Sequence, residues 1–175
     1  MLSQKIQSVI RDVPDFPRPG IIFKDITPIL MNPTLSEEVV DGMRQELNGV
    51  KIDAVVGVES RGFLFGMMLA NVLGVPFVPV RKAGKLPYKV VSQKYELEYG
   101  AAEVEMHVDA IQKDWNVVLH DDLLATGGTA AAAAELIEKL GGKVSAFAFV
   151  IELGFLNGTE ALKKYSDKMI SLVKY

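Results

Sequence analysis

Four short, mostly apolar runs limit what this chain can fold into more than any other feature. The runs are IDAVVGVE (52–59), VPFVPVR (75–81), WNVVLHDD (115–122) and KVSAFAFVIE (143–152). Near-continuous runs of Val, Ile, Phe and Ala are typical of strands that are buried on both faces, as in parallel sheets. We therefore predict an α/β fold with a central, mainly parallel sheet flanked by helices, to which ISLVKY (170–175) adds a last strand.

Helical patterns separate several of these runs. SRGFLFGMMLANVLG (60–74) indicates a loop and a helix that ends at Gly74, and a second helix is expected over residues 129–140. The stretch from residue 62 to residue 80 has no charged side chain and is nearly long enough to cross a bilayer. Because it contains Pro76, Pro79 and the break at Gly74, we interpret it as a helix followed by a strand.

The N-terminal part has a different pattern. An amphipathic helix is expected to stop before Pro14, and PDFPRPG (14–20) is too rich in proline to be regular. IIFKDITPIL (21–30) follows as a short strand or loop. Helix signals return after Asn32-Pro33, with Ser36 as the expected N-cap.

A polar insertion between two strands interrupts the alternation of strand and helix. Residues 82–107, KAGKLPYKVVSQKYELEYGAAEVEMH, indicate an extended hairpin or ribbon. A long insertion of this kind is typical of a mobile lid over an active site. The alternative is a solvated surface hairpin with no role in function.

Composition excludes several classes of function. The 175 residues are consistent with one domain, and the absence of cysteine excludes disulfides and thiolate metal sites. Two histidines are too few for a histidine-rich metal centre, and the net charge of -3 gives no electrostatic footprint for nucleic acid. The N-terminus carries charges throughout and lacks an apolar signal core. We expect a cytoplasmic enzyme or binding domain, with no nucleic-acid partner and no membrane association.

The segment HDDLLATGGT (120–129) follows the third apolar run, where ligands collect in open α/β sheets. It lacks the Gly-Lys-Ser/Thr of a nucleotide-triphosphate loop and the glycine spacing of a dinucleotide fingerprint. It offers backbone N–H groups and threonine hydroxyls at a helix start, which suits one terminal phosphate monoester. Gly and Thr also begin helices for purely structural reasons, and that alternative stays open.

Two aspartates precede this anion site and define the rest of the ligand. Asp121 and Asp122 point in opposite directions if the strand continues through them. A carboxylate does not stabilise a phosphate, but it accepts hydrogen bonds from sugar hydroxyls. One aspartate can bind the ribose diol, while the other orders the loop or reaches a lysine or hydrated Mg²⁺. A ribose 5-phosphate fits this combination.

These residues resemble the signature of the type I phosphoribosyltransferases. The segments PDFPRPGIIFKDITPIL, VESRGFLFG, RKAGKLP, LEYG and DDLLATGGT, in this order, are similar to the adenine-specific members of that family. The resemblance implies conversion of adenine and 5-phosphoribosyl-1-pyrophosphate to AMP and pyrophosphate. Mg²⁺ would be held mainly through the substrate and water, with no direct protein ligand. It also implies a homodimer, a small N-terminal hood over residues 14–35 that binds the base, and a flexible lid over residues 82–107.

The resemblance implies a role for each matching residue in binding the donor. The 5′-phosphate and ribose would be bound by Asp121, Asp122, Ala125, Thr126, Gly127, Gly128 and Thr129. The pyrophosphate would be bound by Ser60, Arg61, Gly62, Arg81, Lys82 and Lys85, some of them from the partner subunit. Related enzymes often have a cis peptide before the serine, so we predict a cis bond between Glu59 and Ser60.

The acceptor and the chemistry involve other segments. By resemblance, Phe23 would stack on adenine or line its pocket, and the backbone of Lys24 would meet the edge of the base. Glu98 is the candidate acid or base, with Glu96 as its competitor, and Tyr99 would help to close the lid. His120 stands where the family often has an aliphatic residue, and we expect a local hydrogen bond there.

Two other functions stay open on the sequence alone. One is phosphoribosyl transfer to another base, because the preference for adenine depends mainly on PGIIFKDITP (19–28). The other is a non-catalytic regulator that binds phosphoribosyl pyrophosphate. Such regulators usually carry an added basic DNA-binding region, whereas this chain is acidic and keeps Glu98 and Phe23. Both observations favour an enzyme.

Overall fold

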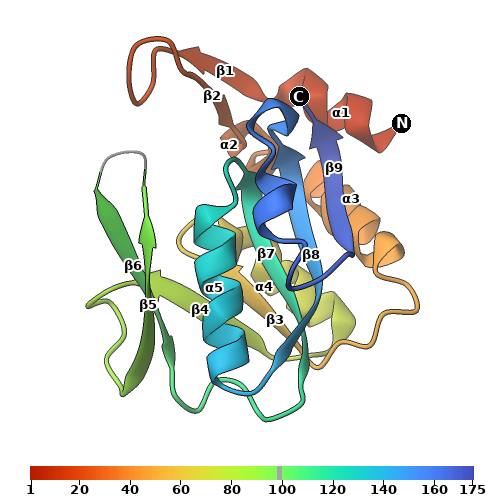
Figure 1. Ribbon diagram of the computed structural model, residues 1–175. Helices are drawn as coiled ribbons and strands as arrows, with labels where there is room; N and C mark the ends of the chain where they lie inside the picture. The colour runs from red at the N-terminus through yellow and green to blue at the C-terminus, as the bar shows by residue number, and fades with distance from the viewer. Residues whose placement is uncertain (98–99) are drawn as a thin grey trace.

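A seven-stranded sheet crosses the computed structural model, which describes residues 1–97 and 100–175, in the order β5-β6-β4-β3-β7-β8-β9 (Figure 1). The strands are β3 (Ala54–Val58), β4 (Phe77–Lys82), β5 (Val90–Glu96), β6 (Ala101–His107), β7 (Asn116–Leu124), β8 (Lys143–Glu152) and β9 (Met169–Lys174). The pairs β4–β3, β3–β7, β7–β8 and β8–β9 are parallel, whereas β6 is antiparallel to both β4 and β5. The predicted mainly parallel sheet is therefore confirmed.

Helices cover both faces of this sheet. The chain forms α1 (Leu2–Val9), α2 (Thr27–Leu30), α3 (Pro33–Glu46), α4 (Gly62–Leu73) and α5 (Gly128–Lys139), with 3₁₀ turns at Gly154–Leu156 and Gly158–Ala161. Helix α5 lies on the near face in Figure 1, and α3 and α4 lie behind the sheet. The sheet is thus the middle layer of three, as the alternation of apolar runs and helices predicted.

Buried side chains in the described part of the chain form one hydrophobic cluster on each side of the sheet. On β8, Phe147 and Phe149 stack on the α5 side with ring centroids 6.3 Å apart. Their neighbours Ala146 and Ala148 belong to the cluster on the α3 and α4 side. This difference follows from the alternation of side chains along a strand. The alanine run of α5 is largely buried, which lets that helix lie close to the sheet.

The apolar stretch from residue 62 to residue 80 divides as predicted. Helix α4 ends at Leu73, Gly74 follows with φ 66°, and β4 begins at Phe77. Glycine adopts this left-handed conformation without steric cost, which explains the break. Among residues 1–97 and 100–175, no helix is both long and apolar enough to cross a membrane.

The N-terminal region contains one strand that the sequence did not predict. β1 (Arg11–Pro14) pairs antiparallel with β2 (Ile22–Asp25), with Val13 opposite Phe23. The proline-rich segment makes the turn between them, and the Asp15 carboxylate accepts a hydrogen bond from the Gly20 N–H at 2.7 Å. This β1–β2 hairpin projects above the end of the sheet in Figure 1. It overlaps the segment over residues 14–35 that was expected to form a hood, and that role stays a prediction.

The insertion folds into the expected antiparallel hairpin. β5 and β6 pair from Val90 opposite His107 to Glu96 opposite Ala101. On β4, Arg81 and Lys82 pair with Glu105 and Val104, so the hairpin extends the main sheet at one edge. Its role as a mobile lid stays a prediction.

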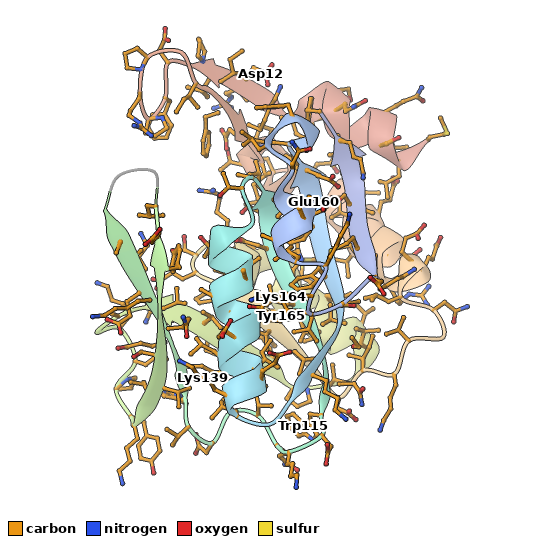
Figure 2. All side chains as sticks on the ribbon, in the orientation of Figure 1. Asp12, Trp115, Lys139, Glu160, Lys164 and Tyr165 are labelled. Atoms are coloured by element: carbon orange, nitrogen blue, oxygen red, sulfur yellow. The ribbon has the colours of Figure 1, made fainter. Side chains whose placement is uncertain are left out.

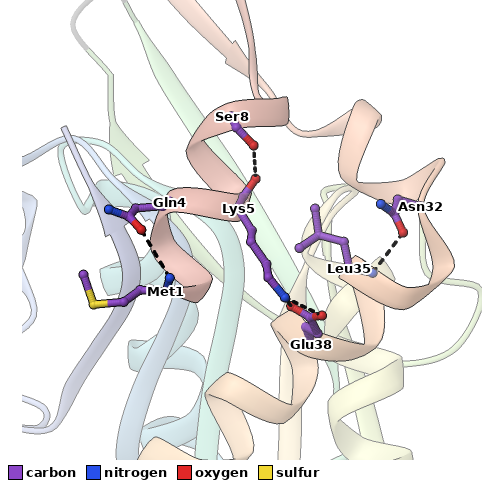
Figure 3. Close-up of polar contacts among 7 residues, drawn as sticks. All are labelled: Met1, Gln4, Lys5, Ser8, Asn32, Leu35 and Glu38. Carbon is purple, nitrogen blue, oxygen red and sulfur yellow. Dashed lines mark hydrogen bonds and ion pairs between the residues drawn. The ribbon is translucent and has the colours of Figure 1, made fainter.

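The predicted N-cap of α3 was wrong by one turn. Asn32 caps the helix, because its side chain accepts a hydrogen bond from the Leu35 N–H at 3.1 Å (Figure 3). Pro33 occupies the first helical position, where its missing N–H costs nothing. Ser36 lies inside the first turn, is buried, and donates its hydroxyl to the Ile29 carbonyl at 3.0 Å. Figure 3 also shows the Lys5–Glu38 ion pair that joins α1 to α3.

Replacement of the observed cap should destabilise the protein. Asn32→Ala removes the acceptor for the Leu35 N–H, and we expect it to lower the free energy of unfolding by about 1 kcal/mol in urea denaturation. Asn32→Asp keeps an acceptor and should lose less. Thr34→Ala, at an exposed position of the same turn, is the matched control and should change little. Equal stability of Asn32→Ala and the wild type would contradict the cap assignment.

Candidate functional site

The carboxyl ends of β3, β4 and β7 meet at the edge of the sheet below the β1–β2 hairpin (Figure 1). Because these strands are parallel, their following loops lie side by side. A strand-end cavity of about 340 Å³ opens between them. It is lined by Glu59, Ser60, Arg61, Lys82, Asp121, Asp122 and Leu123. The fold therefore brings together the two aspartates and half of the residues that were predicted to bind pyrophosphate.

An ion pair joins the loop after β3 to the end of β7. Arg61 Nε lies 2.6 Å from Asp122 Oδ2, and the Asp122 side chain is only 4% exposed. The Arg61 guanidinium also lies near the Phe23 ring, with Cζ 5.2 Å from its centroid. Arg61 thus links three segments that the sequence assigned to the pyrophosphate, to the ribose and to the acceptor base.

Asp121 and Asp122 both line the strand-end cavity, so they do not point to opposite sides as predicted, although their hydrogen-bond partners differ. The Asp121 carboxylate accepts a hydrogen bond from the Asp122 N–H at 2.9 Å. Its carboxyl reaches the cavity, yet surrounding protein atoms raise its pKa well above the ordinary value, and the nearby Asp122 charge raises it further. Asp122 is the carboxylate that pairs with arginine, so the two acids offer different hydrogen-bonding properties to a ligand.

Gly62 has a packing role that was not predicted, and its role toward pyrophosphate stays a prediction. A Cβ atom at this position would lie 2.9 Å from Asp121 Oδ1 and 3.0 Å from the His120 carbonyl oxygen. The first turn of α4 therefore approaches the end of β7 too closely for a side chain. This contact holds the Ser60–Gly62 loop against the aspartates.

The loop between β7 and α5, where an anion site is predicted, leads directly into the first turn of α5. Gly127 has φ 84°, and a Cβ atom there would collide with the Gly158 carbonyl oxygen. The first N–H groups of an α-helix have no acceptor within the helix. A loop cavity of about 80 Å³ lies beside them, lined by Asp121 and residues 123–130. Asp121 and Leu123 line both this cavity and the strand-end cavity, so the two compartments adjoin at the end of β7.

A hairpin cavity lies on the other side of the loop. Its volume is about 480 Å³, and it is lined by Arg18, Tyr95, Glu96, Leu97, Thr126, Gly128 and Thr129. The Thr129 hydroxyl lies 3.2 Å from the Tyr95 hydroxyl, which joins the start of α5 to β5. Neither Tyr95 nor Arg18 was singled out from the sequence. Tyr95 could have been noticed as an aromatic residue in the polar insertion, three positions before Glu98.

A hood cavity of about 700 Å³ lies between the β1–β2 hairpin and the segments that follow β7 and β8. It is lined by Arg18, Pro19, Gly20, Ile21, Ile22, Lys24, Thr126, Leu153, Phe155, Leu156 and Tyr175. Lys24 Nζ lies 2.7 Å from Asp12 Oδ1 and 3.9 Å from the centroid of the Tyr175 ring. Figure 2 shows Asp12 on the hairpin above the sheet. The predicted base-binding segment thus lines a mainly apolar compartment.

Phe23 lies on the opposite face of β2 from Ile22 and Lys24, because strand side chains alternate. Its ring contacts Phe16 edge to face, with centroids 5.2 Å apart, and it lies near Arg61. Phe23 therefore borders the Arg61–Asp122 pair. Its predicted contact with adenine stays a prediction.

The cations predicted to bind pyrophosphate lie in different surroundings. Lys82 lines the strand-end cavity. Arg81 instead contacts Glu59 through Nη2 at 2.8 Å and the Lys85 carbonyl oxygen through Nη1 at 3.2 Å. The Lys85 side chain is exposed. Roles for Arg81 and Lys85 toward pyrophosphate stay predictions.

The sequence interpretation gave Glu59 no role, although it is an acid next to a predicted anion loop. Its carboxylate accepts hydrogen bonds from Arg81 and from the Lys82 N–H at 2.9 Å. The Arg81 hydrogen bond holds the pKa of Glu59 below its ordinary value. The peptide bond between Glu59 and Ser60 is cis, as predicted.

Three other residues were singled out from the sequence, namely Glu98, Tyr99 and His120. Glu98 and Tyr99 lie outside the described residues, so their positions are not assigned. His120 is fully buried, and its Nδ1 makes a hydrogen bond at 2.8 Å to the Ala148 carbonyl oxygen of the neighbouring strand β8, rather than to a residue close by in the chain. Burial lowers the pKa of His120 to about 4, so the imidazole is neutral at physiological pH.

The acidic groups at this edge can assist a metal without forming a metal centre of their own. Within the described residues, no group of three or more His, Asp or Glu side chains is arranged to hold an ion. Asp121 and Asp122 supply two carboxyl groups beside the cavity. Mg²⁺ is commonly bound by one or two carboxylates together with water and substrate phosphates, so this donor set fits that ion.

Comparisons with known proteins agree with this geometry. Residues 29–173 match the family model of the phosphoribosyl transferase domain. The adenine phosphoribosyltransferase of Flavobacterium johnsoniae is 54% identical over 92% of this chain and 95% of its own. The crystal structure of the Thermoanaerobacter pseudethanolicus enzyme has a TM-score of 0.96 and 48% identity over the whole of both chains. The Saccharomyces cerevisiae enzyme, complexed with an imino-altritol bisphosphate and adenine, has a TM-score of 0.92 and 44% identity over 98% of each chain.

The motifs, the fold and these relatives agree along nearly the full chain. The chain therefore belongs to the phosphoribosyltransferase family and, within it, to the adenine phosphoribosyltransferases.

Proposed function

We propose that the protein transfers the phosphoribosyl group of 5-phosphoribosyl-1-pyrophosphate to adenine in the cytoplasm, giving AMP and pyrophosphate. One observation carries this function. Two unlike carboxyl groups line a cavity bordered by Arg61 and Lys82, and one of them, Asp121, also lines the cavity beside the start of α5. A sugar with a phosphate at one end and a pyrophosphate at the other matches that order of groups.

Each end of the donor has a matching group on the protein. The loop from Ala125 to Thr129 supplies N–H groups and hydroxyls to the 5′-phosphate, and Asp121 and Asp122 accept hydrogen bonds from the ribose hydroxyls. The Ser60–Gly62 loop and Lys82 bind the pyrophosphate. A guanidinium carries five N–H groups, and the hydrogen bond from Arg61 to Asp122 uses the one on Nε. Arg61 can therefore keep its contact with the Asp122 carboxylate and at the same time donate a hydrogen bond to a pyrophosphate oxygen.

Residues of this chain stabilise the charges that develop during the reaction. The bond from ribose to pyrophosphate breaks through an oxocarbenium-like state, as in other glycosyl transfers. Arg61 and Lys82 stabilise the negative charge on the departing pyrophosphate, and the aspartates favour the positive charge on the sugar. Mg²⁺ bound to the donor would neutralise further charge on the leaving group. Glu98 accepts or supplies a proton at the purine.

The acceptor occupies the space between the β1–β2 hairpin and the phosphate loop. The yeast relative was solved with adenine, which supports adenine as the base for this chain. A backbone N–H and C=O pair distinguishes a 6-amino from a 6-oxo purine. The 6-amino group donates a hydrogen bond to a C=O group, whereas the 6-oxo group accepts one from an N–H group. We assign this hydrogen bonding with the edge of the base to the backbone of Lys24. Its position is fixed by the contacts of its side chain with Asp12 and Tyr175.

The reaction itself is the first test. Purified protein with phosphoribosyl pyrophosphate and Mg²⁺ should form AMP from adenine, as measured by liquid chromatography, and should form little product from hypoxanthine or guanine. Faster turnover of a 6-oxo purine would identify a different acceptor. No product from any of the three bases would favour the non-catalytic regulator.

The role of Glu98 can be separated from that of its neighbour. Glu98→Gln removes a proton-transferring group, and we expect kcat to fall by about 10²-fold or more while the affinity for phosphoribosyl pyrophosphate is nearly unchanged. Glu96→Gln is the matched control, two residues away at the end of β5. A larger loss of kcat for Glu96→Gln than for Glu98→Gln would exchange the two assignments.

We also propose that the protein is a homodimer in which α4 faces the partner. Leu64, Met67 and Val72 on this helix are 43%, 54% and 52% exposed, and α4 has no charged residue. The helix begins directly after Arg61, so a partner on this face would lie near the strand-end cavity. This arrangement is consistent with the expectation that the partner supplies some of the cations.

A charge on this helix should weaken association. Met67→Glu buries a carboxylate in the proposed interface, and we expect light scattering to show a shift from dimer toward monomer at micromolar concentration. Met31→Glu introduces the same change at a position that is 82% exposed outside α4 and should leave the dimer intact. A Met67→Glu protein that is as dimeric as the wild type would exclude this interface.

A further inference from the structure

The Tyr95 hydroxyl contacts the phosphate loop from outside it. Tyr95 Oη lies 3.2 Å from Thr129 Oγ1, in the first turn of α5. The ring packs over the same turn, since a Cβ atom at Gly128 would lie 3.7 Å from Tyr95 Cδ2. The rest of the ring is half-buried and contacts the hydrophobic cluster on the α5 side of the sheet. The position of the hydroxyl is therefore set by packing.

A second contact fixes the same strand to the same helix. Lys139, in the last turn of α5, donates from Nζ to the Ser92 carbonyl oxygen of β5 at 2.8 Å. Figure 2 shows Lys139 at the end of α5 that lies away from the β1–β2 hairpin. Strand β5 is thus fastened to α5 at two points, and Tyr95 is the point at the phosphate end.

The hydrogen-bonding capacities of the two hydroxyls determine what Tyr95 does when a phosphate is bound. A phosphate dianion only accepts hydrogen bonds, so the single hydroxyl hydrogen of Thr129 must point toward it. Thr129 Oγ1 is then available as an acceptor, and the Tyr95 phenol can donate to it. The chain of donors runs from Tyr95 to Thr129 to phosphate, and each bond in such a chain strengthens the next.

We propose that Tyr95 is a positioning residue for the 5′-phosphate, acting through Thr129. This inference rests on the proposed function, in which the loop from Ala125 to Thr129 binds that phosphate. Tyr95 orients the Thr129 hydroxyl as a donor and polarises it. Because Tyr95 precedes Glu98 by three residues, the same hydrogen bond links the donor site to the segment that carries the candidate acid or base.

Tyr95→Phe tests the hydroxyl and keeps the packed ring. We expect the dissociation constants of AMP and ribose 5-phosphate, measured by titration calorimetry, to rise about fivefold to tenfold, which is the usual effect of one lost hydrogen bond. Adenosine lacks the phosphate, and its affinity should not change. Tyr88→Phe, at an exposed tyrosine of the same insertion, is the matched control. Equal losses for AMP and adenosine, or no loss for either, would overturn the proposal.

A double-mutant cycle separates action through Thr129 from direct contact with the phosphate. In a Thr129→Val background, Tyr95→Phe should have no further effect on the affinity for ribose 5-phosphate. A full effect in that background would show that Tyr95 acts without Thr129 and would overturn the proposal. These measurements need no turnover. Failure of the wild type to form AMP would therefore count against the proposed function and leave the test of Tyr95 intact.

Discussion

The site depends on the close contact between the start of α4 and the end of β7. Gly62 lies against Asp121 with no room for a side chain, and the neighbouring Arg61 pairs with the buried Asp122. These two contacts join loops that are about sixty residues apart in the chain. Without them, the groups proposed to bind pyrophosphate and ribose would lie on independent loops. An arginine with a buried carboxylate partner also has a fixed position before any ligand arrives.

Sequence patterns predicted most of the sheet because its strands are buried on both faces. The runs at β3, β4, β7 and β8 are apolar almost throughout. Short runs of this kind are typical of strands in a parallel sheet that is covered on both faces. β1 was missed because Arg11, Asp12 and Pro14 give it no apolar pattern, and it exists only through its pairing with β2. The cap of α3 was misplaced because Ser36 and Asn32 are both good caps. The choice between them depends on where Pro33 starts the helix.

The candidate site was predicted where a short motif carries its own chemistry. The aspartates, the small-residue loop and the cis peptide at Glu59–Ser60 belong to continuous segments and were found from the sequence. Tyr95 and Glu59 were not, because their significance comes from partners far along the chain. The Glu59 contact with Arg81 joins the end of β3 to β4, and the Tyr95 contact with Thr129 joins β5 to the start of α5. Only the tertiary structure brings such pairs together.

Thr126 borders the loop, hairpin and hood cavities but not the strand-end cavity. In the proposed reaction, the 5′-phosphate and the base of AMP would occupy the compartments that meet at Thr126, whereas pyrophosphate would occupy the strand-end cavity beyond the ribose. The two products would therefore have separate exits. Pyrophosphate could leave past Lys82 while the nucleotide stayed bound, so the partition of the site itself favours an ordered release of products.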